Sequence, residues 1–154
     1  MGPGREPQGI SAPAKMVTQP IPFSHKRHAQ AGMDCDTCHL ALGTGEQLQI
    51  PGAAECMGCH RSIRKDSPAI QKLAQLEKEN QPLLWTRLYH LPNFVFFSHQ
   101  KHIDANVKCV VCHGAVKDRD NIWQEKDVSM VACVDCHKLR KVSVSCDLCH
   151  NIGH

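Results

Sequence analysis

Five copies of one short motif constrain the fold of this chain more than any other feature. All ten cysteines fall into Cys-x-x-Cys pairs, and a histidine directly follows every pair. The five copies are CDTCH (35–39), CMGCH (56–60), CVVCH (109–113), CVDCH (133–137) and CDLCH (146–150). Two thiols at this spacing can bond to the two vinyl groups of one porphyrin, and the adjacent histidine then lies beneath the iron. The motifs therefore predict five covalently attached haem c groups.

Every motif predicts two thioether-forming cysteines and one proximal iron ligand. The cofactor-binding cysteines are expected to be Cys35, Cys38, Cys56, Cys59, Cys109, Cys112, Cys133, Cys136, Cys146 and Cys149. The proximal ligands are expected to be His39, His60, His113, His137 and His150. A single Cys-x-x-Cys pair could also be half of a zinc site or a redox disulfide, but neither needs a histidine directly after the second cysteine.

Five macrocycles would also explain an unusual composition. Only seven of the 154 residues are aromatic, namely four Phe, two Trp and one Tyr, which is few for a conventional core in a chain of this length. We therefore expect a small multihaem cytochrome c fold, mainly coil with short α-helices, in which the haems form the core. Without them the chain would be largely unfolded, as in small domains whose metal supplies the folding energy.

A second pattern repeats at a constant spacing of 74 residues. The segments FSHKRHAQAGMDCDTCH (23–39) and FSHQKHIDANVKCVVCH (97–113) share a Phe-Ser-His start, a second histidine three residues on and the same gap to the motif. Two histidines three residues apart can point towards two different haems, so each pair would connect neighbouring haems. The expected distal ligands are His25, His28, His99 and His102.

Three further side chains are candidates for the remaining sixth ligand. His90 lies in a locally apolar stretch, where the alternative is a core histidine hydrogen-bonded to backbone. His154 is the last residue, a position where fraying is common. Met130 lies three positions before the first cysteine of CVDCH and could supply a thioether ligand, which raises the potential of a haem, or could instead be buried filler.

Composition divides the chain into four segments. Residues 1–22 form a Pro/Gly-rich tail, 23–66 a dihaem module, 67–96 a helix and linker, and 97–154 a trihaem module. The tail is expected to be extended and without a core, either as a disordered remnant or as an arm lying against a partner. Within the linker segment, residues 67–80 predict a helix with Ser67 as its cap, Pro68 at its first position and an apolar stripe. Short helices are also expected after each motif, and no strand alternation stands out.

Charge and hydropathy exclude several functions. The net charge of +3 and the lack of a basic run among aromatics argue against nucleic acid. Ten haem propionates would change that charge to about −7 with ferrous irons or about −2 with ferric irons, so partners are expected to dock through basic patches or an exposed haem edge. The longest apolar runs are too short for a membrane span, and no secretory signal stands out. Because haem attachment implies export, we expect an anchor or leader to be missing, or membrane association through a partner.

The segment FSHKRH…CDTCH resembles the start of class III, low-potential multihaem cytochromes c. Residues 85–138, which include WTRLYHLPNFVFFSHQKH, VKCVVCHGAV and SMVACVDCHK, look more specifically like the pentahaem subunit of alternative complex III and related quinone-linked redox complexes. This resemblance covers residues 23–150. It implies that the paired histidines are distal ligands, and it implies a periplasmic or extracytoplasmic subunit that accepts electrons from a quinol-oxidising membrane complex of a respiratory chain.

The sequence therefore predicts an electron-transfer protein rather than an enzyme. Enough candidate ligands exist to fill both axial positions of every iron, and a saturated iron has no vacant position for a substrate. The expected function is a pentahaem cytochrome that relays electrons along closely spaced, mostly bis-histidine haems. Two alternatives are a multihaem enzyme that reduces a small substrate at one open iron, and a cytochrome that assembles into conductive filaments.

Overall fold

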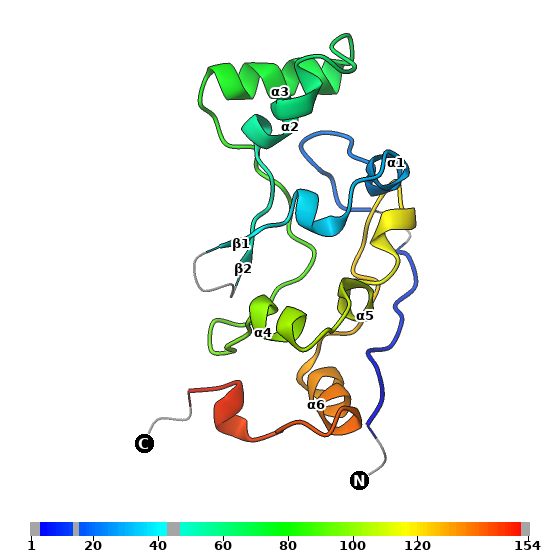
Figure 1. Cartoon of the computed structure of the whole chain (residues 1–154), viewed down its shortest axis with the longest axis vertical. Helices are drawn as coiled ribbons and strands as arrows, with labels where there is room; N and C mark the ends of the chain where they lie inside the picture. Colours follow the sequence, from blue (N-terminus) through cyan, green and yellow to red (C-terminus); the bar gives the residue numbers. More distant parts are fainter. Residues whose placement is uncertain (1–3, 14–15, 43–46, 152–154) are drawn as a thin grey trace.

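The computed structural model describes residues 4–13, 16–42 and 47–151. Most of the chain is coil, interrupted by short helices and turns, as the sequence predicts (Figure 1). In chain order the elements are α1 His25–Gln30, η1 Cys35–Thr37, β1 Ala41–Leu42, β2 Gln47–Leu48, α2 Ala53–His60, α3 Pro68–Lys78, α4 His99–Asp104, α5 Cys109–His113, η2 Val116–Asp118, α6 Met130–Leu139 and η3 Cys146–Leu148. None of the helices in these ranges is long and apolar enough to cross a bilayer.

The Cys-x-x-Cys-His segments lie inside helical turns, which corrects the expectation that helices follow them. Helix α2 ends on the histidine of its motif, α5 consists of its motif, and α6 contains its motif. The remaining two motifs begin in the 3₁₀ turns η1 and η3. A helical turn explains this placement, because residues three apart in a helix point to the same side and bring the two thiols together.

A small hairpin follows the first motif and was not expected from the sequence. Strand β1 pairs antiparallel with β2, with Ala41 opposite Leu48 and Leu42 opposite Gln47. Each strand has two residues, which is too short for an alternating apolar pattern to be recognised.

The helix predicted over 67–80 is confirmed as α3, and it contributes two of the six side chains of the apolar core. Ser67 is at the N-cap position and Pro68 follows it, although the Ser67 side chain makes no capping hydrogen bond. Ile70 and Leu73 are buried against α2, and Leu73 is only 2% exposed. The core cluster consists of Ile21, Ala53, Met57, Ile70, Leu73 and Leu83.

This core occupies one end of an elongated molecule. In Figure 1, α2 and α3 lie at the top, α4 and α5 lie lower, and α6 and the C-terminal segment lie at the bottom. Among the described residues, Ala132 is the only buried hydrophobic residue outside the α2–α3 cluster. Most of the chain thus lacks an apolar core of its own, and hydrophobic burial alone does not account for its fold.

The N-terminal segment packs against its own chain, where the sequence left open a disordered tail or an arm on a partner. Gly9 forms an antiparallel bridge with Lys126, and the backbone amide of Ile10 donates to Glu125 at 2.7 Å. The side chain of Ile21 is buried in the α2–α3 cluster. The expectation of a tail without a core is therefore wrong for this residue.

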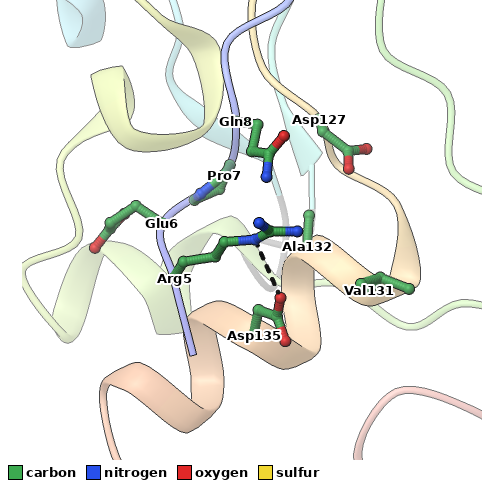
Figure 2. A pocket seen from close by; sticks show the side chains of 8 residues that line it. All are labelled: Arg5, Glu6, Pro7, Gln8, Asp127, Val131, Ala132 and Asp135. Carbon is green, nitrogen blue, oxygen red and sulfur yellow. Dashed lines mark ion pairs between the residues drawn. The ribbon is translucent and has the colours of Figure 1, made fainter. Parts of the chain in front are cut away.

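The first described residues of this segment lie directly on α6 (Figure 2). Arg5 forms an ion pair with Asp135 at 3.5 Å, and Glu6 forms one with Arg140 at 3.0 Å. A β-carbon at Gly4 would collide with the backbone of Asp135, so only glycine allows this close approach. These contacts connect the beginning of the described chain with the helix that carries the fourth motif.

Candidate haem sites

Two pairs of histidine rings face each other at a distance that fits one metal ion between them. The ring centres of His25 and His39 are 6.5 Å apart with planes inclined by 13°, and those of His99 and His113 are 6.4 Å apart with planes inclined by 12°. Two metal–nitrogen bonds of about 2.0 Å, and about 1.1 Å from each nitrogen to its ring centre, place the centres of two opposed imidazoles about 6.2 Å apart. The spacing thus fits axial ligation from both sides.

Two further pairs have the same spacing but more inclined planes. His28 and His60 are 6.2 Å apart at 66°, and His102 and His137 are 6.1 Å apart at 45°. In all four pairs, one ring comes from a Cys-x-x-Cys-His motif and the other from a histidine pair of α1 or α4. The first histidine of each helix faces the nearest following motif, and the second faces the motif after that.

The repeated Phe-Ser-His start explains how α1 holds its two histidines. The hydroxyl of Ser24 caps α1 by accepting from the backbone N–H of Arg27 at 3.1 Å. His28 Nδ1–H donates to the carbonyl of Ser24 at 2.8 Å, and the ring of Phe23 stacks on His28 with centres 4.5 Å apart. Serine at the N-cap satisfies one of the free backbone donors of the first turn.

The same arrangement recurs in the second copy. Ser98 accepts from the backbone of Lys101 at 3.3 Å, His102 Nδ1–H donates to the Ser98 carbonyl at 2.8 Å, and Phe97 stacks on His102 at 4.6 Å. Phe23, Ser24 and their counterparts thus position the histidine pairs of α1 and α4. Both copies of the repeat contain the phenylalanine and the serine, but a role was predicted only for the histidines.

Backbone carbonyls also orient four of the motif histidines through Nδ1. His39 donates to Gln49 at 2.8 Å, His60 to Ile63 at 2.9 Å, His137 to Ser143 at 2.8 Å and His150 to Phe94 at 3.1 Å. A proton on Nδ1 leaves Nε2 with its lone pair, and metal-binding histidines commonly have such a second hydrogen bond. The residues present therefore fit an iron ligand in both tautomer and orientation.

Burial keeps His25 in the form that binds a metal. Its pKa is lowered from 6.5 to about 4, chiefly by burial and then by the nearby rings of His39 and His28. The pKa of His113 is also lowered, by burial first and then by His99 and His39. A metal binds neutral imidazole, so both residues are in the required protonation state at neutral pH.

The cysteines and the apolar residues around them fit a bound porphyrin as well. None of the ten cysteines forms a disulfide, and half of them are exposed and half partly buried. Every motif has an exposed large apolar side chain inside it or within three residues after it, with exposures between 46% and 54%: Leu40, Ile63, Val110, Leu139 and Leu148. Within the described ranges, no three His, Cys, Asp or Glu side chains converge as a zinc site requires.

Comparisons with known proteins agree with this chemistry. Residues 95–151 match the model of the family described as cytochrome c7 and related cytochrome c. The chain is a multihaem cytochrome c. It is 28% identical to the menaquinone reductase multihaem cytochrome c subunit of Nitratidesulfovibrio vulgaris, over 86% of this chain and 76% of that protein. It is 27% identical to cytochrome c3 of Maridesulfovibrio salexigens, over 84% of this chain and 89% of that protein.

The motif of residues 146–150 differs from the other four in this cytochrome. Within the described part of the chain, the aromatic ring that contacts His150 is that of Phe94, with centres 5.9 Å apart, rather than a second imidazole. His150 is held by an antiparallel bridge to Val95. For a haem at this motif, the three further candidates are therefore the side chains to consider as sixth ligand.

The three candidates differ in exposure and position. His90 is exposed, which contradicts a core histidine, and its Nε2 is 3.0 Å from the carbonyl of Arg87. Met130 begins α6 with 66% exposure, so it is not buried filler in this chain. His154 lies outside the described residues. The ligand role stays a prediction for each of them.

Proposed function

We propose that this chain is a pentahaem electron carrier in which four irons have two histidine ligands each. The observation that carries the proposal is the set of four imidazole pairs with ring centres 6.1–6.5 Å apart. Bound haem iron supplies reversible one-electron exchange between its ferric and ferrous forms, without bond making in a substrate. The pairs support His25 with His39, His28 with His60, His99 with His113, and His102 with His137.

The side chains of this protein hold, orient and separate the cofactors. The motif cysteines anchor each porphyrin, and carbonyl-bound Nδ1 atoms fix the imidazole planes. Ligation of an iron by two opposed imidazoles changes little between its oxidation states. Each electron therefore arrives and leaves with little rearrangement of the ligands. Filling both axial positions also keeps small molecules away from those four irons, which favours electron transfer over catalysis.

We further propose that the partner is a quinone-linked membrane complex, of the kind to which alternative complex III belongs. The name of the Nitratidesulfovibrio vulgaris relative, a menaquinone reductase subunit, supports this proposal. In such a complex this chain would take up or deliver electrons one at a time, while the two-electron chemistry of the quinone occurs in the partner. Haem attachment to thiols also supports a periplasmic or extracytoplasmic location, with membrane association through the partner.

Intact mass and carbon monoxide binding test the proposal on natively matured protein. We expect a mass increase equal to five covalent haems. Ferrous protein should bind carbon monoxide at no more than one iron, because four irons already have two ligands. Carbon monoxide binding at most of the haems, or a mass with fewer than five haems, would refute the proposal. Titration with the purified quinone-linked complex then tests the partner.

The environment of His150 favours one second candidate function. If Phe94 rather than an imidazole covers that iron, the fifth haem has a vacant position and could reduce a small oxyanion or hydroxylamine. A ferric high-spin signal from one of the five irons, together with turnover of nitrite or hydroxylamine, would support the reductase. A fully low-spin ferric spectrum without turnover would leave electron transfer as the sole function.

A further inference from the structure

We infer that the five motifs are arranged in one row whose order differs from the sequence: 56–60, 35–39, 109–113, 133–137 and 146–150. Electrons then enter or leave at the motif of α2 and at the C-terminal motif, and the other three motifs are internal. This inference rests on the proposed electron-transfer function and specifies the route through it. Four junctions, each between two neighbouring motifs of the row, support this order.

Helix α1 makes the first junction. His25 faces His39 and His28 faces His60, so two rings on one turn of helix serve the motifs 35–39 and 56–60. The cysteines of these motifs are also neighbours, since burial and then the Cys59 thiol raise the pKa of Cys38. The two motifs are therefore adjacent in space, although 16 residues, which include β1 and β2, lie between them in the chain.

The second junction joins the two copies of the repeat through equivalent residues. Helix α1 of the first copy packs against η2, the turn that follows the motif 109–113. Cys35 and Cys109, which occupy the same position in the two copies, are neighbours as well, since the pKa of Cys35 is raised by burial and then by the Cys109 thiol. His39 likewise lies close enough to its counterpart His113 to lower the pKa of that residue, after burial and His99. Contact between equivalent residues is what an approximate two-fold axis between the copies would produce. It makes 35–39 and 109–113 the central pair of the row.

Helix α4 makes the third junction in the same way as α1 makes the first. His99 faces His113 and His102 faces His137, which places the motifs of α5 and α6 side by side. The pKa of Cys112 is raised to about 11, by burial first and then by the thiols of Cys136 and Cys133. The histidine rings and the cysteine thiols thus both identify the motif 133–137 as the neighbour of the motif 109–113.

The fourth junction connects α6 with the last motif. Only eight residues lie between the motifs 133–137 and 146–150 in the chain, and the pKa of Cys133 is raised by burial and then by the Cys149 thiol. Cys149 is held in place by the backbone amide of Phe96, which donates to its carbonyl at 2.8 Å. Figure 1 shows the same sequence of elements along the long axis, from α2 at the top to α6 and the C-terminal turn at the bottom.

The last motif makes the two ends of the row different. The motifs of α2, η1, α5 and α6 form a nearly symmetric set, because each half contains one helix with two histidines and two motifs. The fifth motif extends this set at the α6 end only. One end is therefore the α2 motif, backed by the apolar α2–α3 cluster, and the other is the C-terminal motif beside Phe94.

Iron positions in the matured holoprotein test this order directly. Anomalous scattering at the iron absorption edge, measured from crystals, locates each iron independently of any partner or activity. We expect five irons whose nearest neighbours follow the order given above. Five irons in another order would overturn this inference and leave the proposed function intact. Fewer than five irons would instead refute the proposed function.

Two matched variants test the order in solution. Cys146→Ala with Cys149→Ala removes an end of the row, whereas Cys109→Ala with Cys112→Ala removes its centre. After flash photoreduction, the first variant should still equilibrate electrons among four haems, and the second only within two separate pairs. Equal equilibration in both variants would contradict the row. If the second variant does not fold, the iron positions of the wild-type protein still decide.

Discussion

Replacing His28 by alanine should open one iron and leave the other four unchanged. The ring of His28 is 6.2 Å from that of His60, and its Nδ1 is held by Ser24, so Nε2 faces the motif histidine. No other imidazole contacts His60 in the described part of the chain. The variant should therefore bind one more carbon monoxide per ferrous protein than the wild type.

The same variant should also change the spin state of a defined fraction of the ferric irons. One of five irons, or one fifth of the total iron, should change from low spin to high spin in the electron paramagnetic resonance spectrum. Added imidazole should enter the space left by the side chain and restore the low-spin signal. This rescue distinguishes a ligand from a residue that only supports α1.

Arg27→Ala is the matched control, because Arg27 lies on the same helix with an exposed side chain. It should keep the wild-type carbon monoxide stoichiometry. Unchanged stoichiometry in His28→Ala, or high-spin iron that imidazole does not convert, would refute the ligand assignment. Loss of more than one low-spin iron would show that α1 depends on this residue for its fold.

Three other expectations concern stability, pH and the N-terminal segment. Leu73→Ala removes a side chain that is 2% exposed and should lower the free energy of unfolding by about 2–5 kcal/mol in denaturant titrations, whereas Leu84→Ala, at 75% exposure, should change it by less than about 0.5 kcal/mol. Because the pKa of His25 is lowered from 6.5 to about 4, the unfolded chain binds the additional proton between these values, so stability should fall as pH decreases through that window; loss of the low-spin spectrum already at pH above 6.5 would contradict this. Gly4→Val should detach the first described residues from α6 and expose them to limited proteolysis, while Gly9→Val, where a β-carbon has no neighbour within 4 Å, should leave the cleavage pattern unchanged.

Local patterns made much of the site predictable from the sequence. The Cys-x-x-Cys-His motifs are contiguous, so their role follows from spacing, and the histidine pair of α1 lies within one turn of helix. The pairing of His28 with His60 was not predictable, because it depends on how α1 packs relative to α2. Periodicity predicted α3 since its apolar stripe spans three turns.

Backbone contacts account for most of what the sequence did not predict. The bridge between Gly9 and Lys126 uses main-chain atoms that every residue has, so no side-chain pattern indicates it. Proline and glycine in the tail predict extended chain, but they do not indicate the surface along which it runs. The motifs form helical turns because both thiols must face one porphyrin, a requirement that helix propensity does not reflect.

The position of the α2–α3 cluster has a consequence for biosynthesis. Six side chains at one end of the molecule are the part of the described chain that ordinary apolar contacts can assemble before any pigment is added. The other described stretches have no comparable cluster, so we expect them to stay open to the enzymes that attach tetrapyrroles. We therefore expect covalent attachment to precede compaction in these stretches, with each attached ring creating the surface on which the next part of the chain packs.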